Sequence, residues 1–486
     1  MYKLDLKVTR VMRRSSLLIA AWLICLLVQA QVRKGTVCRL GFTYEISQND
    51  NWGNGRPVVK QITPNTSADR SGLAVYDLIE TIDGFSTLEL SPDEIEILLN
   101  PVDKSDVMLT VRNMNPSPRR VLIKKECKKA NAISEGQLAT AFQMYSLETT
   151  EEREFVCPFK TTVTKDPVDF ANYHTFAFAT PDPVNAKLED AINEVIEKEL
   201  IKKGLRLETE QPDILVQTFY FYDKNPNYRG MNKLVISRDP VYRFNVLTGQ
   251  MEEFPFLDNT ASESEAEYLL QFGIRLIDQR DVLGRVLWEC ESNEMMTNSF
   301  RLEEYVQIHA PLMCMQFPYL TYTSYPTFRA CKKRYNYTGI QYDIDQINQV
   351  VAVDRNSPAA EAGIRPRDII QRIGKYRMDY TIDEFSHAYK QFIANTISYR
   401  DPTTLFTDAN GFKYCMYWDT FKYTKIAEAL KDADYLPAFS YLYAFMPFVN
   451  PSGNNACTFA IKRGSSEMEI VVRPAILSEM TLEIKY

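Results

Sequence analysis

An internal repeat is the feature of this sequence that most limits how the chain can fold. Residues 57–84 and 350–374 share one order: a strand, a turn, a short helical turn of small residues, a glycine and a second strand. Asp77 and Asp368 stand at matching points, just before the second strand of each copy. The sequence therefore predicts two copies of one small unit, separated by a long middle region.

The sequence upstream of each copy adds a second signature. The two segments are Arg39-Leu40-Gly41-Phe42 and Tyr337-Thr338-Gly339-Ile340. Together with the repeat, they resemble the PDZ domain, whose Gly-Leu-Gly-Phe loop binds a peptide carboxylate. The resemblance covers about residues 38–127 and 334–475, and it is stronger in the first copy.

The resemblance implies that each copy binds a peptide as an added strand, with the peptide carboxylate held by backbone amides of the loop. By this resemblance the peptide-binding residues are Leu40, Gly41, Phe42, Ile95 and Leu99 in the first groove, and Gly339, Ile340, Phe385 and Tyr389 in the second. Pro92 and Ile382 stand where many family members carry histidine, so a preference for peptides with Ser or Thr (class I) is not expected.

An insertion leaves an alternative open for the second copy. Residues 395–455 interrupt it before its last strands and are rich in Tyr and Phe, which would be able to pack over the groove and block it. In that case the copies would serve as structural units, with grooves filled by the chain's own segments.

The middle region, residues 150–325, predicts a sheet domain of its own. Period-two strands are indicated at 173–179 and 213–222, with an amphipathic helix between them; a hairpin at 271–289 and a helix at 300–314 follow. The order resembles a domain of unknown function that recurs in Gram-negative envelope proteins, often lipoproteins. This resemblance is carried by Asp169-Phe170, Tyr173, Lys203-Gly204, Pro212-Asp213 and Leu287-Trp288. It implies an α+β sheet and an envelope location, and it brings no known activity.

The N-terminus has the pattern of a secretory signal peptide. An apolar run from Leu17 to Val28 follows three arginines and ends in a small-x-small site before Gln31. The run is shorter than the roughly 20 residues of a bilayer span. We therefore predict cleavage after Ala30 and a location in the periplasm or at the surface of a Gram-negative bacterium, without an integral membrane span. An uncleaved anchor is the alternative.

Export changes what the cysteines can do. Nine occur, and eight remain after removal of Cys25 with the signal, an even number that permits disulfides in an oxidising compartment. Cys38 with Cys127 would tie the ends of the first copy, and Cys415 with Cys457 would close the insertion. Buried free thiols are the alternative.

Composition and motifs argue against an enzyme. A net charge of −7 leaves no excess of Lys and Arg to neutralise nucleic-acid phosphates. The chain has three histidines, and it lacks the Gly-x-Ser-x-Gly, His-Glu-x-x-His and Asp-Thr/Ser-Gly motifs of hydrolases. We therefore predict no catalysis, no cofactor and no metal site.

These observations predict a multidomain α+β protein. Two PDZ-like, partly open β-barrels (31–130 and 334–486) flank a central α+β domain (150–325). The expected function is that of an exported, non-catalytic scaffold that binds extended peptide segments or protein C-termini. The alternatives are a regulatory subunit of an exported protease, and a purely structural envelope protein with self-filled grooves.

Overall fold

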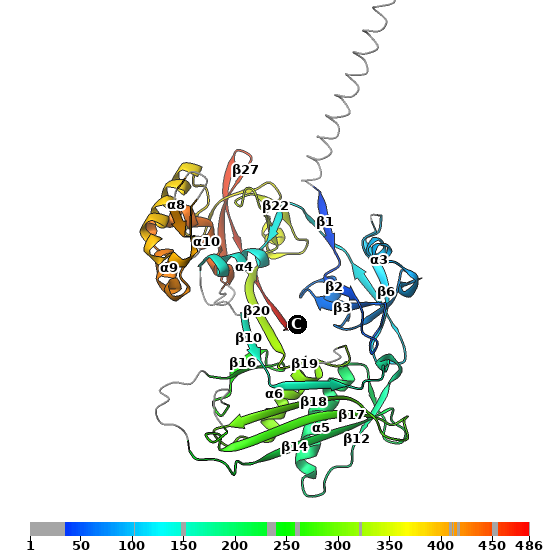
Figure 1. The fold of residues 1–486 in the computed structure, drawn as a ribbon. Coiled ribbons are helices and arrows are strands. Elements are labelled where there is room, and N and C mark those ends of the chain that lie inside the picture. Colours follow the sequence, from blue (N-terminus) through cyan, green and yellow to red (C-terminus); the bar gives the residue numbers. More distant parts are fainter. Residues whose placement is uncertain are drawn as a thin grey trace, which may run out of the picture. The chain divides into compact units, whose positions relative to one another are not determined.

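Figure 1 shows the fold in a computed structural model of the protein. The described residues are 35–485, apart from 102, 147–151, 231–239, 258–262, 320–322, 408–410, 412, 416–417 and 450–454. The predicted signal peptide, residues 1–30, lies outside the described residues. Among the residues that are described, no helix is long and apolar enough to span a membrane.

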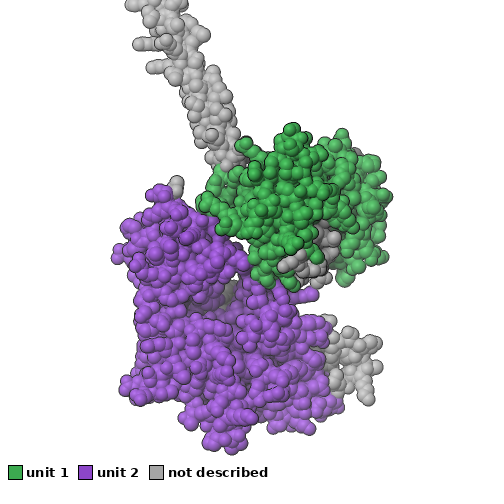
Figure 2. Space-filling view, turned by 180° about the vertical axis from the view of Figure 1, so that it is seen from behind, with its two compact units in different colours: residues 1–38, 127–151, 333–479 green, residues 39–126, 152–332, 480–486 purple. Residues whose placement is uncertain are grey.

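The chain divides into two compact units, which Figure 2 shows in different colours. Unit 1 consists of residues 1–38, 127–151 and 333–479, and unit 2 of residues 39–126, 152–332 and 480–486. Unit 2 therefore holds the first copy of the repeat together with the central domain, and unit 1 holds the second copy with its insertion. The mixed α and β multidomain architecture agrees with the predicted class.

The first copy, called here the first module (residues 39–126), folds into one six-stranded sheet. Its strands are β2 (Phe42–Ile46), β3 (Pro57–Ile62), β4 (Leu78–Ile82), β6 (Asp106–Arg112) and β7 (Arg119–Lys124), hydrogen-bonded in that order, with β5 (Phe85–Ser86) paired to β4. The helices are α2 (Ser67–Arg70) and α3 (Pro92–Leu99). A capping box fixes the start of α3, because Ser91 and Glu94 each accept the other's backbone N–H.

The central domain is a mixed sheet with two long helices. Its seven strands, in spatial order, are β13 (Arg206–Leu207), β12 (Thr175–Phe178), β14 (Ile214–Lys224), β17 (Tyr268–Asp278), β18 (Val286–Met296), β11 (Phe159–Val163) and β19 (Thr323–Ser324). Helix α5 (Ala186–Lys202) connects the parallel strands β12 and β14, and α6 (Leu302–Cys314) follows the hairpin of β17 and β18. The sequence predicted each of these strands and helices except the short strands β11, β13 and β19, of which β13 and β19 lie at the edges of the sheet.

The first module and the central domain share one hydrophobic core. Trp52 and Met114 of the module are fully buried in the same cluster as the central sheet. The backbone N–H of Met114 donates to the carbonyl of Lys203 at 3.0 Å, and Nδ1 of His174 lies 2.8 Å from the carbonyl of Met114. Gly204 (φ +97°) passes so close to the module that a Cβ there would lie 2.4 Å from the side chain of Asn113. The two regions therefore form a single folding body.

The second copy, called here the second module (residues 334–475), contains two sheets. One has the order β22 (Val350–Val353), β21 (Ile340–Asp343), β9 (Ala132–Ser134), and the other β24 (Tyr376–Arg377), β23 (Ile369–Ile373), β27 (Cys457–Arg463), β28 (Ser466–Val472). Its helices are α7 (Pro358–Ala362) and α8 (Ile382–Thr396). Strand β9 comes from elsewhere in the sequence and is followed by α4 (Glu135–Ser146). A separate three-stranded sheet has the order β10 (Glu152–Val156), β20 (Thr327–Tyr337), β29 (Ala475–Lys485).

The insertion adds helices α9 (Tyr423–Ala429) and α10 (Leu436–Val449) and the hairpin of β25 (Leu405–Thr407) and β26 (Lys413–Cys415). Phe392 of α8 is buried in a small core with Ile426, Leu430 and Tyr435 of the insertion. Helix α8 is thus attached to the insertion through its C-terminal half.

The two modules have the same order of elements and repeat the same buried ion pair. In the first, Nη2 of Arg119 lies 2.6 Å from Oδ2 of Asp77; in the second, Nε of Arg463 lies 2.8 Å from Oδ1 of Asp368. Both aspartates are 1% exposed, and each also accepts a backbone N–H three residues upstream. The repeat that the sequence displays is therefore also a repeat of contacts.

The described cysteines include one predicted disulfide and several free thiols. Cys38 and Cys127 form a disulfide across the paired strands β1 (Thr36–Arg39) and β8 (Glu126–Lys129). It closes a loop, with a sequence separation of 89, that contains the whole first module. Cys457 is a free thiol, so the bridge to Cys415 is not formed. Cys157 and Cys290 are free and buried, as the alternative expected.

Candidate peptide-binding grooves

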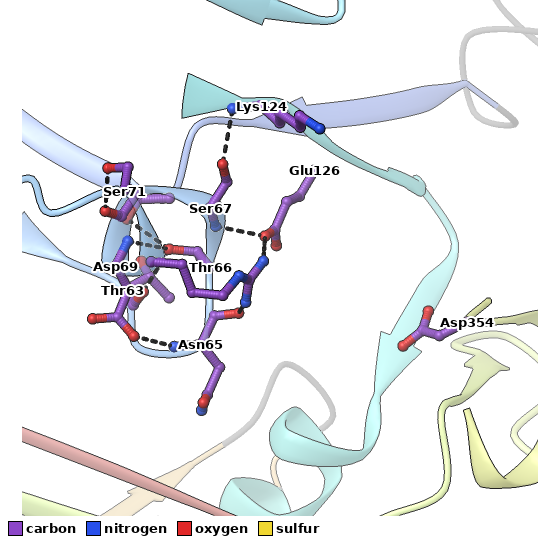
Figure 3. A network of polar contacts seen from close by, with 12 residues as sticks. Thr63, Asn65, Thr66, Ser67, Asp69, Ser71, Lys124, Glu126 and Asp354 are labelled. Atoms are coloured by element: carbon purple, nitrogen blue, oxygen red, sulfur yellow. Dashed lines mark hydrogen bonds and ion pairs between the residues drawn. The ribbon is translucent and has the colours of Figure 1, made fainter. Parts of the chain in front are cut away.

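The first loop, Leu40 to Phe42, is held in shape by the start of α2. Gly41 has φ +85°, and a Cβ there would lie 2.4 Å from Oγ1 of Thr66, the N-cap residue of α2. The carbonyl of Gly41 accepts the N–H of Thr63 at 2.8 Å, and Oγ1 of Thr66 donates to the carbonyl of Thr63 at 2.6 Å. Figure 3 shows the polar contacts around Thr66. Only glycine fits this backbone, and its carbonyl points inward.

The amide groups of this loop are available for a ligand. Among the described residues, the backbone N–H groups of Leu40 and Gly41 have no hydrogen-bond acceptor. The side chain of Leu40 is buried in the module core, which anchors the loop while leaving these donors in place. Successive free amides beside a glycine of positive φ form a site for an anion.

The groove continues from the loop along β2 and α3. Within the described part of the chain, β2 is paired along one edge only, to β3. Phe42 is half-buried and packs against the core to which α3 contributes Ile95 and Leu99. The structure therefore brings all five residues predicted for the first groove into one loop, strand and helix arrangement.

A hydrogen bond joins the two sides of the first groove. The hydroxyl of Tyr44, on β2, donates to Oε2 of Glu96, on α3, at 3.0 Å. Burial, reinforced by Glu96, raises the pKa of Tyr44 to about 12. The tyrosine therefore stays a neutral donor at any physiological pH.

The second loop, Thr338 to Ile340, has nearly the same backbone. Gly339 has φ +87°, and a Cβ there would lie 2.2 Å from the Cβ of Ser357, the N-cap residue of α7. The carbonyl of Gly339 accepts the N–H of Asp354 at 2.8 Å, the counterpart of the bond from Thr63 in the first loop. The same restriction to glycine applies here.

A carboxyl group of the chain itself fills the second loop. Oε2 of Glu135 accepts the backbone N–H of Thr338 at 2.7 Å and that of Gly339 at 3.1 Å, and the hydroxyl of Thr338 donates to Oε1. Glu135 is 2% exposed. Burial raises the pKa of Glu135 to about 7, against the effect of its three donors.

The segment before Glu135 is an added strand. Strand β9 lies antiparallel along β21, with Ser134 opposite Gln341 and Ala132 opposite Asp343. The direction of β9 carries the chain toward the second loop, as the resemblance implies for a bound peptide. Residues 132–135 therefore pair with β21 and place a carboxyl group on the amides of the second loop.

The insertion changes which helix covers the second groove. Phe385 and Tyr389 of α8 were expected to line it, but they are 37% and 44% exposed and stack on each other with ring centroids 6.1 Å apart. The ring of Phe445, on α10, instead packs against Tyr342 of β21 at 5.0 Å between centroids. The reason is that Phe392 of α8 packs with residues of the insertion, whereas Phe445 of α10 belongs to the core that contains Tyr342 of β21.

Gly339 and Ile340 of the predicted second set therefore lie beside Glu135 and β9, with Ile340 1% exposed, whereas Phe385 and Tyr389 are exposed and neither belongs to the core that contains Tyr342. Sequence reasoning missed Glu135 and Phe445. The only local signal at Glu135 is the helix start Ser134-x-x-Gln137, which forms a cap in the structure. That signal predicts a helix and does not indicate where the carboxyl group binds.

Two of the three histidines have defined contacts: Nδ1 of His174 lies 2.8 Å from the carbonyl of Met114, and His309 lies in the core, whereas His387 is exposed. His309 is fully buried and stacks on Tyr305 at 3.8 Å, and burial together with the nearby Arg243 holds its pKa well below the usual range. Among the described residues, no group of three or more His, Cys, Asp or Glu side chains is placed to hold a metal ion.

Family models match two parts of the sequence. The PDZ domain model matches residues 29–112, and the model of a domain of unknown function (DUF4136) matches residues 160–319. The resemblances stated for the first copy and for the middle region are thereby confirmed. Both domains are non-catalytic in general.

One solved structure is similar over nearly the whole chain. A PDZ domain protein from Parabacteroides distasonis is 61% identical, with 93% of this chain and 100% of that chain covered and a TM-score of 0.72. The chain belongs to this family of PDZ domain proteins. The chain therefore contains a PDZ domain, a peptide-binding module of protein interactions.

Two further structures give weaker matches. The HtrA3 PDZ domain bound to a phage-derived ligand is 20% identical over 20% of this chain and 91% of that chain, with a TM-score of 0.17. A PelC dodecamer from Paraburkholderia phytofirmans is 13% identical over 34% of this chain and 95% of that chain, with a TM-score of 0.15. No curated protein sequence matches the chain.

Proposed function

We propose that this PDZ domain protein is an exported, non-catalytic adaptor that binds extended peptide segments or protein C-termini through its first groove. One observation carries the proposal: the amides of Leu40 and Gly41 have no acceptor among the described residues, at the end of an edge strand with one free side. An arriving peptide would pair with β2 and place its carboxylate on these donors. Phe42, which is half-buried, would contact its last side chain, and Ile95 and Leu99, at 1% and 2% exposure, belong to the core against which Phe42 packs.

The same proposal treats the second module as a second PDZ-like unit. The repeated Asp–Arg pair, the positive φ of Gly339 and the inward carbonyl of that glycine support it. The N-terminal sequence supports export to the periplasm or the cell surface. The disulfide between Cys38 and Cys127 fits an oxidising compartment.

The direct test is a binding screen with the whole mature chain, residues 31–486. The isolated first module is unsuitable, because Trp52 and Met114 are buried in a core shared with the central domain. Fluorescent peptides with free C-termini are expected to bind at micromolar concentrations, and amidation of the C-terminus is expected to weaken binding at least ~10-fold, since the terminal charge meets backbone donors.

Gly41→Val tests the site. It is expected to abolish this binding, because a Cβ at Gly41 meets Thr66. Gly84→Val is the matched control: Gly84 has φ +90°, but no atom lies within 4 Å of its would-be Cβ, so it carries the backbone strain without the collision. Equal binding by wild type and Gly41→Val would overturn the assignment of the first groove.

A purely structural role is the second candidate, and the filled second groove favours it. If the screen finds no peptide that binds the first groove, the purely structural role is favoured. The adaptor proposal requires at least one groove that accepts an external segment.

A further inference from the structure

The second groove differs from an ordinary C-terminus site in the group it binds. The carboxyl group at the loop belongs to the side chain of Glu135, and the chain continues beyond it into α4. Gly136 lets the chain continue from Glu135 into α4 close to Tyr335, because a Cβ at this position would lie 3.0 Å from the hydroxyl of Tyr335. That hydroxyl is itself fixed by a 2.8 Å bond to Glu479, so a larger residue would have to displace it.

The strand that carries Glu135 is held by few contacts. Ala132, Ile133 and Ser134 are each only partly buried, and β9 has three residues. The amide of Ser134 donates within its own helix cap, to Gln137. Ile133 packs against the core of the second module, and the strand otherwise pairs with β21 through a ladder of three residue pairs, which is a modest interface.

Two contacts upstream keep the strand near the groove. Nδ2 of Asn131 donates to Oδ2 of Asp343 at 2.7 Å, and Nζ of Lys129 donates to the carbonyl of Val351 at 3.1 Å. On the downstream side Leu138 and Ala139 of α4 are buried, and Leu138 belongs to the core of the second module. The segment is therefore anchored at both ends, while its centre makes the ligand-like contacts.

We propose that the second groove is a binding site for extended segments that carry an internal glutamate, and that residues 132–135 occupy it as a displaceable ligand from the same chain. The proposal rests on the PDZ-like character proposed for the second module. It does not depend on what the first groove binds.

Residues 132–135 belong to the same chain as the groove, and this linkage determines how much they weaken the binding of an external peptide. A short linker keeps a ligand at an effective concentration on the order of millimolar. A peptide that binds the open groove at about 10 μM would then bind the occupied groove roughly 100-fold more weakly. An external partner must therefore be abundant, or tethered itself, to displace the strand.

The test uses a fluorescent copy of residues 129–138 with both termini blocked, so that its only acidic group is the glutamate corresponding to Glu135. It is added to the full mature chain and to the Glu135→Ala variant, in which the loop donors have lost their acceptor. We expect binding to the variant at least ~100-fold tighter than to wild type. The same peptide with alanine in place of glutamate is expected not to bind.

Glu126→Ala is the matched control. Glu126 also accepts a backbone N–H, that of Ser67 at 2.8 Å, but it lies outside the second groove. It should leave the affinity for the peptide at the wild-type level. Equal affinity of wild type and Glu135→Ala, or equal binding of the glutamate and alanine peptides, would overturn the proposal.

A second measurement does not depend on a variant. In hydrogen exchange of wild type, the amides of Thr338 and Gly339 should exchange at least ~100-fold more slowly than those of Leu40 and Gly41, because only the former have an acceptor. Similar exchange at the two loops would contradict the proposal. Binding of free C-termini at the first groove is a separate result, so failure of one proposal does not decide the other.

Discussion

The first and second loops follow the same backbone path but differ in what their amide groups bind. Gly41 and Gly339 have φ of +85° and +87°, and the carbonyl of each accepts the N–H of a residue just after the next strand. In the first loop the amides have no acceptor among the described residues, whereas in the second they hold Glu135. The loop geometry therefore does not depend on a bound carboxylate, and the donors are arranged before a ligand arrives.

The helices beside the two grooves differ more than the loops do. In the first module α3 buries Ile95 and Leu99 against the sheet, with 1% and 2% exposure. At the matching positions of α8, Phe385 and Tyr389 face solvent. The insertion supplies Phe445 in their place. The same repeat therefore gives one groove with its own helix and one covered by an inserted helix.

The largest effect is expected where the insertion enters the second module. Phe445 is 1% exposed and packs on Tyr342, so Phe445→Ala should lower the free energy of unfolding of unit 1 by about 3–5 kcal/mol through lost packing and a cavity. Urea unfolding followed by hydrogen exchange at β21 measures it. Unit 2 should keep its stability, because its own core is unchanged.

Phe421→Ala is the control within the same insertion. Phe421 is 99% exposed, so its removal should change the unfolding free energy by less than about 0.5 kcal/mol. A loss at Phe445 no larger than that at Phe421 would mean that α10 does not cover the second groove in solution.

The next largest effect is a pH dependence that is expected for the second groove, where Glu135 is docked. The docked carboxyl of Glu135 has a pKa raised by burial to about 7, with Asp354 adding to the rise, whereas the released side chain titrates near 4.5. The docked state therefore binds the proton more tightly. Docking of β9 is strongest below pH 4.5, weakens as the pH rises to about 7 and is constant above that, a change of about 3 kcal/mol.

Hydrogen exchange of β9 in wild type and in Glu135→Gln, at matched pH values, measures this change, because intrinsic exchange rates cancel in the comparison. The opening free energy of wild type relative to the variant should fall between pH 4.5 and 7. A rise over that range would mean that the three hydrogen bonds from Thr338 and Gly339 outweigh burial.

The repeated turns and loops of the two modules could be predicted from the sequence because their constraints are local. Two glycines, Gly41 and Gly339, have a positive φ, which favours glycine. Two aspartates, Asp77 and Asp368, each accept a backbone N–H from three residues upstream. Both requirements act over short stretches of chain, so they appear as a pattern in the sequence. The strands and helices of the central domain were predicted from periodicity for the same reason. The five residues predicted for the first groove come from one module, and their contacts with a peptide stay a prediction.

The second groove was not predictable in the same way. Its occupant, Glu135, lies more than 200 positions from the loop it fills, with a separation of 203 to Thr338. Its sequence is that of any capped helix start, and nothing local marks its carboxyl as a ligand. Likewise the exposure of Phe385 follows from the position of α10, which only the folded insertion determines. The shared core of Trp52 and the central domain is a further long-range contact without a local signal.

The smallest effect compares two tyrosines at matching positions, Tyr44 on β2 and Tyr342 on β21. The hydroxyl of Tyr44 donates to Glu96, so Tyr44→Phe should cost about 0.5–1 kcal/mol of unfolding free energy. The hydroxyl of Tyr342 is buried with no hydrogen-bond partner among the described residues, so Tyr342→Phe should be neutral or stabilise by up to about 1 kcal/mol. Thermal unfolding of both variants measures the difference. A clear loss at Tyr342→Phe would mean that this hydroxyl has a partner in solution, such as a buried water, and that the second groove is less tightly covered than the packing of Phe445 indicates.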